Sequence, residues 1–182
     1  MRERIGRMIA CAAIGLALVS CAKAPSSRAA LLPADYARWD RSVDRLLDYP
    51  IPGHGDDARL IFMNGTAFAA ASAPKDGAVT FPEGSVVIKE IYEGLKPAAG
   101  QAPAMLTAMV KAPGDPAAID GWIWVVKDLS TGTESVMDAD FCATCHAAAN
   151  EAHPYGDKNP AEAFRDGVFI LPSAAGAGGD GY

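Results

Sequence analysis

Residues 85–92, which read SVVIKEIY in one-letter code, decide the fold. Valine, isoleucine and tyrosine dominate this run, and such residues favour extended strands. Successive side chains of a strand point to opposite faces, so Lys89 shares one face with Val87 and Ile91 while Glu90 lies on the other. Because apolar residues stand on both faces, we expect a strand that is largely buried on both sides.

Three further runs have the same apolar or alternating character, and they predict more strands. They are residues 59–63, 105–111 and 121–127. Turn-forming pieces separate the runs, at residues 74–77, 97–100, 113–116 and 130–132. These connections are too short for the crossover helices that parallel strands need, so the sequence predicts an antiparallel sheet.

Cys142, Cys145 and His146 have the spacing C-x-x-C-H, the most specific motif of the chain. Two thiols at this spacing can bond to the vinyl groups of one porphyrin, and the histidine can bind its iron. A thioredoxin-type redox pair and half of a zinc site are the alternatives. The redox pair does not need the histidine, and a zinc site would need a second ligand pair, whereas the only other cysteines are Cys11 and Cys21. The motif therefore predicts one covalently bound haem c, with His146 as its iron ligand.

Two helices are expected beside the sheet. Asp140 could cap a short helix that carries the haem motif. Residues 33–48 predict one amphipathic helix with Pro33 near its start. Its apolar stripe consists of Tyr36, Trp39, Val43, Leu46 and Leu47. The predicted fold class is therefore α+β: a single domain dominated by an antiparallel β-sheet, with an N-terminal helix and a short haem-bearing helix.

The N-terminus is predicted to be an export signal, because a basic start precedes an apolar run that is too short to span a bilayer. Residues 18–21, LVSC, resemble a bacterial lipobox, in which Cys21 becomes the lipidated first residue after cleavage. Ordinary cleavage near Ala22 or Ala24 is the alternative. Either form of cleavage would place the chain on the periplasmic side. A lipid on Cys21 would anchor it to the bacterial (outer) membrane without spanning it.

The predicted organisation has four parts. They are a lipoprotein-type signal peptide at residues 1–20, a flexible tether at 21–32, a mono-haem c domain at 33–172 and a disordered tail at 173–182. The formal net charge of −6 at pH 7 gives no support for binding nucleic acid or a polybasic membrane contact.

The late position of the haem motif argues against a small helical electron carrier with histidine and methionine ligands. In that class the methionine lies downstream of the motif, whereas Met137, the last of the six methionines, precedes it here. The four-helix-bundle cytochromes c′ need four long helices, which this chain does not offer. The pattern therefore predicts an iron whose distal side is open.

The order and spacing of the motifs resemble the cytochrome P-460 family, which includes the cytochromes c′-beta, over roughly residues 33 to 170. The matching pieces are residues 59–64, 81–90, 109–111, 121–124, 142–146 and 166–169. The resemblance implies a β-rich, commonly dimeric protein with one c-type haem. Some members oxidise hydroxylamine and would pass electrons to a soluble cytochrome acceptor, whereas the c′-beta members bind nitric oxide or carbon monoxide in an apolar pocket.

Two further site residues follow from this resemblance. Lys89 matches a lysine that is bonded to the porphyrin edge in the hydroxylamine oxidisers, and Arg59 matches an arginine near the distal pocket. A buried lysine shifts toward its neutral, nucleophilic form, which makes such a bond chemically reasonable. The alternatives are a lysine that reaches solvent or pairs with a carboxylate, and an Arg59 that forms a surface ion pair with Asp56 or Asp57.

A distal proton acceptor is also expected for hydroxylamine oxidation, because protons leave with the electrons. Glu134, Asp138 and Asp140 are the candidates ahead of the motif, but direct register with the family places Met137 there. Without this base, a purely gas-binding protein is the second functional hypothesis.

The other histidines and the aromatic residues are weaker candidates. His54 could line the mouth of the pocket, although an exposed loop is favoured, and His153 is a remote candidate for a sixth iron ligand because Pro154 predicts a turn there. The tryptophans Trp122 and Trp124 alternate onto one sheet face and are expected in the core. The phenylalanines Phe62, Phe68 and Phe81 could cap the distal pocket or pack in the core.

Overall fold

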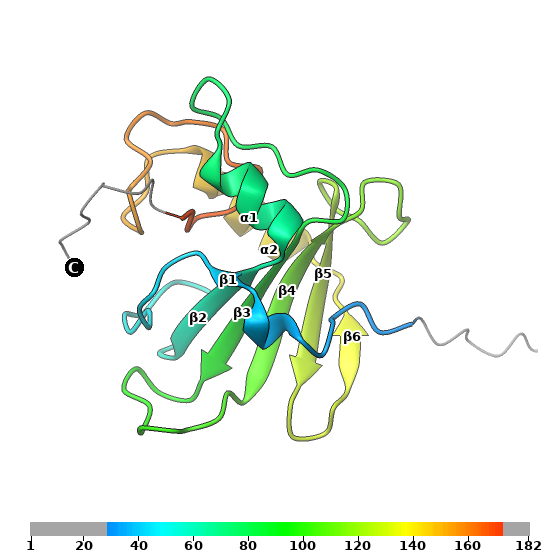
Figure 1. The fold of residues 1–182 in the computed structure, drawn as a ribbon, viewed down its shortest axis with the longest axis vertical. Coiled ribbons are helices and arrows are strands. Elements are labelled where there is room, and N and C mark those ends of the chain that lie inside the picture. The colour runs from blue at the N-terminus through cyan, green and yellow to red at the C-terminus, as the bar shows by residue number, and fades with distance from the viewer. Residues whose placement is uncertain (1–28, 173–182) are drawn as a thin grey trace, which may run out of the picture.

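One antiparallel sheet, with its strands in sequence order, forms the centre of the computed structural model, which describes residues 29–172 (Figure 1). The strands are β1 (Asp40–Arg41), β2 (Ala58–Met63), β3 (Val86–Tyr92), β4 (Met105–Lys111), β5 (Trp122–Asp128) and β6 (Glu134–Val136). Each of the four predicted runs is within one residue of β2, β3, β4 or β5 at both ends. The predicted α+β class and the antiparallel arrangement are confirmed.

The two faces of the sheet build two separate apolar clusters. On the cavity face, Met63, Val87, Met109 and Trp124 are successive partners across β2 to β5. They pack with the helices α1 (Gly65–Ser72) and α2 (Asp140–Ala147), which lie over one end of the sheet (Figure 1). The outer face carries the second cluster, which includes Ile88, Leu106 and Val125. Lys89 lies on the cavity face because it alternates with Ile88 along β3.

The predicted N-terminal helix over residues 33–48 is wrong. Its place is taken by a 3₁₀ turn, η1 (Tyr36–Arg38), by β1, and by an extended segment along β2. Leu47 and Arg59 exchange both main-chain hydrogen bonds (2.9 and 3.0 Å), and the N–H of Ser42 donates to Ile61. The edge of β2 thus satisfies backbone groups that a helix would have paired internally, which is how tertiary context overrides an amphipathic pattern.

The apolar residues of the predicted stripe still become buried, but against the sheet. Tyr36 and Trp39 pack on the outer-face cluster together with Leu31 and Leu32. The Tyr36 hydroxyl donates to Glu90 at 2.9 Å. The segment therefore serves as a cover for the outer face.

Asn64 begins α1, an element that the sequence analysis missed. Its side-chain oxygen accepts from the N–H of Ala67 at 2.9 Å, the bond of an N-cap, and from the N–H of Val86 at 3.1 Å. One side chain therefore starts the helix and fastens it to β3. In the sequence, an asparagine followed by several alanines could have predicted this helix.

The short haem-motif helix is present as α2, but its N-cap is Ala139 rather than Asp140, and no side chain caps it. Asp140 is the first helical residue, so its carboxylate stands where the positive end of the helix dipole favours a negative charge. The 3₁₀ turn η2 (Ala148–Asn150) follows α2.

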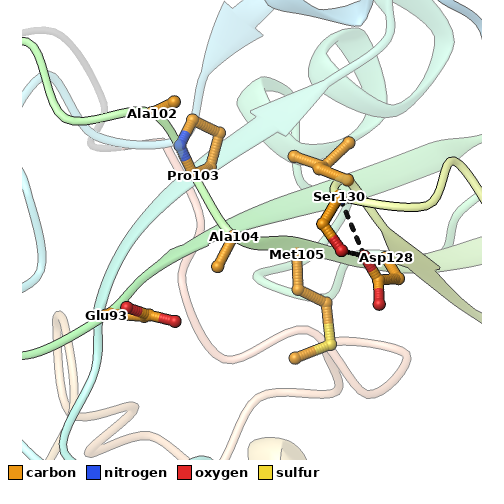
Figure 2. A pocket seen from close by; sticks show the side chains of 8 residues that line it. Glu93, Ala102, Pro103, Ala104, Met105, Asp128 and Ser130 are labelled. Atoms are coloured by element: carbon orange, nitrogen blue, oxygen red, sulfur yellow. Dashed lines mark hydrogen bonds between the residues drawn. The ribbon is translucent and has the colours of Figure 1, made fainter.

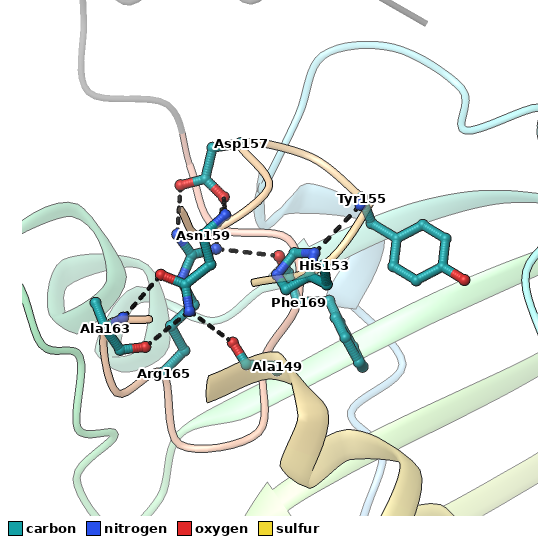
Figure 3. Close-up of polar contacts among 8 residues, drawn as sticks. All are labelled: Ala149, His153, Tyr155, Asp157, Asn159, Ala163, Arg165 and Phe169. Carbon is teal, nitrogen blue, oxygen red and sulfur yellow. Dashed lines mark hydrogen bonds and ion pairs between the residues drawn. The ribbon is translucent and has the colours of Figure 1, made fainter. Parts of the chain in front are cut away.

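Residues 151–172 lack regular helices and strands, and side-chain bonds hold them (Figure 3). Asn159 is 1 % exposed, and its amide group bonds to the carbonyls of Ala149 and Ala163 and to the N–H of Ala163 at 2.9–3.1 Å. Arg165 holds Asp157 with two bonds of 2.6 and 2.5 Å. These bonds position the loop so that Phe169 and Gly167 lie against α2.

Replacing Asn159 with alanine should lower the free energy of unfolding by about 1–3 kcal/mol, because buried backbone groups would lose their partner. Urea denaturation of the haem-loaded protein measures the change. The exposed neighbour Glu151 supplies the control, since E151A should stay within about 0.5 kcal/mol of the wild type. Equal stability of N159A and E151A would contradict this role.

The predicted signal peptide, the lipidated Cys21 and the tail at 173–182 lie outside the described residues. No helix among residues 29–172 has the length and apolar character to cross a membrane.

Candidate haem site

A cavity of ≈ 740 Å³ lies between the cavity face of the sheet, α2 and the loops around residues 49–57 and 152–170. Its volume is in the usual range for cofactor sites, about 300–1,000 Å³. The residues that line it include the haem-motif residues and the two residues that the family resemblance adds: Cys142, Cys145, His146, Lys89 and Arg59. Three segments that are far apart in the chain therefore converge on one site.

His146 is oriented as an iron ligand would be. A carbonyl can only accept, so Nδ1 of His146 donates to the carbonyl of Gly167 at 2.8 Å and Nε2 keeps its lone pair. A second bond of this kind commonly fixes the tautomer of a metal-binding histidine. The rings of Trp124 and Phe169 stand edge-on at 4.7 and 5.4 Å between centroids. Burial lowers the pKa of His146 to about 4, which keeps the imidazole neutral.

Gly167 is suited to this contact by its conformation. Its φ is +82°, where a side chain is strained, and a Cβ there would lie 3.7 Å from the carbonyl oxygen and 3.8 Å from the Cβ of His146. These are ordinary contact distances, so the backbone conformation, rather than a lack of space, favours glycine here.

The two motif cysteines fit covalent attachment of haem. Cys142 and Cys145 are three residues apart in α2, so they lie on the same side of the helix as His146. Both are free thiols, one partly buried and one exposed. Within residues 29–172, no group of three or more His, Cys, Asp or Glu could hold a metal ion by itself, so the zinc alternative finds no further ligands there.

Lys89 points into the cavity from the middle of β3. Its Nζ lies 2.7 Å from Nδ1 of His54 and 3.3 Å from Nε2. Burial, aided by the charge of Arg59, lowers the pKa of Lys89 to about 7. The contact is with an imidazole rather than with solvent or a carboxylate, and a large fraction of the amine is neutral near pH 7.

Arg59 is 1 % exposed and lines the cavity, so the alternative of a surface ion pair is excluded. Its guanidinium donates to the main-chain oxygens of Tyr49 (2.6 Å) and Asp57 (3.1 Å) and stacks 5.1 Å above the Tyr49 ring. Burial lowers its pKa, but the group stays protonated in proteins. The cavity therefore has a fixed positive charge in its wall.

The three carboxylates predicted as proton acceptors do not line the cavity. Glu134 pairs with Lys127 in the β5–β6 register and accepts from the N–H of Leu31 at 2.5 Å, which directs it to the outer face. Asp138 and Asp140 are exposed. Met137, the residue in direct register with the family position, does line the cavity.

The structure also decides between the alternatives for the two remaining histidines. His54 is partly buried and lines the cavity, which an exposed loop residue would not do. His153 accepts the N–H of Tyr155 on Nδ1 at 3.2 Å, so in its neutral form Nε2 carries the hydrogen and has no lone pair for iron (Figure 3).

Trp122, Trp124 and Phe81 belong to the cavity-face cluster. Trp122, Trp124, Phe62 and Phe81 are at most 6 % exposed, and Phe68 packs on the cavity-face cluster from α1. None of the three phenylalanines is among the described residues that line the cavity. Its aromatic wall consists instead of Tyr49, Trp124, Phe141, Tyr155 and Phe169. Sequence reasoning missed most of them, although Phe141 stands directly before Cys142.

A second hollow of ≈ 570 Å³ lies where the β3–β4 connection meets the β5–β6 turn (Figure 2). The Asp128 carboxylate there accepts from the hydroxyl and N–H of Ser130 (2.6 and 2.7 Å) and from the N–H of Thr131 (3.1 Å). These bonds close the turn, as an aspartate commonly does. The hollow contains none of the predicted site residues.

Comparison with known proteins agrees with this geometry. The model of a family described as Cytochrome P460 matches residues 33–170. No curated protein matches the chain.

Proposed function

Because the chain belongs to the cytochrome P460 family, we propose that this haem c cytochrome oxidises hydroxylamine or a related small nitrogen species and passes the electrons to a soluble cytochrome acceptor. The observation that carries the proposal is the position of Lys89. Its amine lines the same cavity as Cys142, Cys145 and His146. In the family that the sequence resembles, the members that oxidise hydroxylamine have a lysine bonded to the porphyrin edge.

The chain's own residues have distinct tasks in this proposal. Haem c would supply the iron that takes electrons from the nitrogen species. His146 holds a neutral imidazole in a fixed orientation. Lys89, with its pKa near 7, presents a largely neutral amine, the form that a bond to the porphyrin edge would need. Arg59 supplies a buried positive charge, which stabilises negative charge that develops on the substrate.

Proton removal needs another residue, since Met137 cannot accept a proton. Asp57 is the carboxylate among the lining residues, and its Oδ1 already accepts from the N–H of Gly94 at 2.9 Å. We assign it as the candidate proton acceptor in place of Glu134, Asp138 and Asp140.

A second candidate function is reversible binding of nitric oxide or carbon monoxide, as in the c′-beta members. The presence of Met137 and apolar residues such as Ile61, Val87 and Ile91 in the cavity wall favours it. Such a wall excludes water and suits a small, uncharged diatomic ligand.

Steady-state turnover separates the two functions. With hydroxylamine and an artificial electron acceptor, the haem-loaded protein should reduce the acceptor, and the D57N variant should do so more slowly. Tight binding of nitric oxide without any reduction of the acceptor would reject the enzyme and support the gas binder.

We further propose that the protein is exported and lipid-anchored through Cys21 on the periplasmic side of the bacterial outer membrane. C21A should then move from the membrane fraction to the soluble fraction, while the haem content stays the same. A C21A chain that remains with membranes would contradict the anchor. A homodimer is also proposed, on the family resemblance, and light scattering tests it.

A further inference from the structure

His54 reaches the centre of the haem site from an irregular loop. Gly53 and Gly55 flank it with φ of +79° and +69°, a conformation that favours glycine. The loop is seated on α2, because a Cβ on Gly53 would lie 3.5 Å from the Phe141 ring, next to Cys142. The loop before β2, rather than the sequence motif, thus brings this imidazole into the cavity.

The imidazole rings of His54 and His146 lie close to each other in the cavity. Their ring centroids are 6.3 Å apart and their planes differ by 79°. Two imidazoles bound to opposite sides of one metal ion, at metal–nitrogen bonds of about 2.0 Å, have centroids roughly 6 Å apart. The observed spacing is therefore that of a pair of axial ligands.

Lys89 holds the His54 ring in this place. Its Nζ lies 2.7 Å from Nδ1 of His54, and both side chains line the cavity. With Nδ1–H donating to the neutral amine of Lys89, Nε2 of His54 keeps its lone pair for the iron. Such second contacts orient a ligand and tune its basicity. The lysine therefore positions a ring that the flanking glycines leave free to turn.

We propose that His54 is the sixth ligand of the haem iron in the resting protein, opposite His146, and that small molecules bind by displacing it. The distal side, which the sequence analysis expected to be open, is thus occupied by a residue of the chain. The proposal rests on haem binding at His146 and not on hydroxylamine oxidation.

The test is the spin state of the ferric haem-loaded protein, measured by electron paramagnetic resonance and optical spectroscopy. The wild type should be low-spin, and H54A should be high-spin. His153, the third histidine of the chain, is the matched control, because its Nδ1 is engaged by Tyr155 and H153A should stay low-spin. Added imidazole should restore the low-spin spectrum of an H54G variant.

Ligand affinity supplies a second readout on the same proteins. If His54 leaves the iron in a fraction on the order of 0.1 of the molecules, H54A should bind carbon monoxide on the order of tenfold more tightly than the wild type. H153A should bind it like the wild type.

Two outcomes would overturn the assignment. One is a high-spin wild-type protein, which is measurable even if the variants fail to mature. The other is a low-spin signal that survives in H54A, and its loss in K89A would then assign the ligand to Lys89. Failure of hydroxylamine turnover in a low-spin protein would reject the proposed oxidation alone, so the two proposals fail separately.

Discussion

Replacing Asp166 with alanine is expected to lower the free energy of unfolding by about 3–5 kcal/mol, because it would strand a buried positive charge. The Asp166 carboxylate pairs with Lys111 at 2.7 Å, and both side chains are about nine-tenths buried. It also accepts the N–H of Phe81 at 3.0 Å. Its main-chain oxygen accepts from Nε1 of Trp122 at 2.9 Å, so the residue joins three elements. Urea denaturation of the haem-loaded protein measures the loss.

A double variant separates the stranded charge from a general packing defect. With Lys111 replaced as well, in D166A/K111M, no unpaired cation remains, and a large part of the lost stability should return. The same pair anchors the loop whose next residue, Gly167, accepts from His146, so D166A should also alter the optical spectrum of the haem. A loss below about 1 kcal/mol in D166A would contradict the role of this ion pair.

Removing the amine of Lys89 should have the largest effect on function. If this amine is bonded to the porphyrin edge, the ferrous Soret band of the wild type is strongly red-shifted, and K89A should lose both the shift and hydroxylamine turnover. The bond replaces a C–H of the porphyrin edge with C–N and releases two protons and two electrons, so it needs an added two-electron oxidant such as hydrogen peroxide. It also needs the neutral amine, whose fraction grows as the pH rises through the pKa of about 7, so attachment with this oxidant should be faster at pH 8 than at pH 6.

The matched control for K89A is K127A, on β5, which β4 separates from β3. Lys127 is not among the residues that line the cavity, and its Nζ lies 3.8 Å from Glu134 on the outer face. K127A should keep the wild-type spectrum and turnover. An unshifted wild-type Soret band would reject the bond to Lys89 and leave gas binding as the better function.

The strands were predictable because the evidence for each is local. In residues 85–92 and 105–111, β-branched and apolar residues face both sides of the sheet, so the pattern does not depend on what covers it. The helix predicted over 33–48 failed for the opposite reason. Its stripe of apolar residues is needed to cover the outer face, and the open edge of β2 offered hydrogen bonds to an extended chain.

The residues of the candidate site likewise differ in whether the sequence alone could place them. Cys142, Cys145 and His146 were identified because attachment and ligation need a fixed spacing along one helix. Glu134 appeared plausible from its distance along the chain, but the alternation of β6 directs it to the outer face. His54 could not be placed, since a glycine-flanked loop carries no periodic pattern.

By itself, the sequence determined the sheet and the haem motif, since each depends on residues near one another in the chain. Only the tertiary structure decided that Gly167 orients His146, that Arg59 is buried in the cavity wall, and that His54 and Lys89 meet. The physical reason is that these contacts join segments separated by 10 to 35 residues. Burial, charge and hydrogen bonding between such segments exist only once the sheet, α2 and the loops have packed around one cavity.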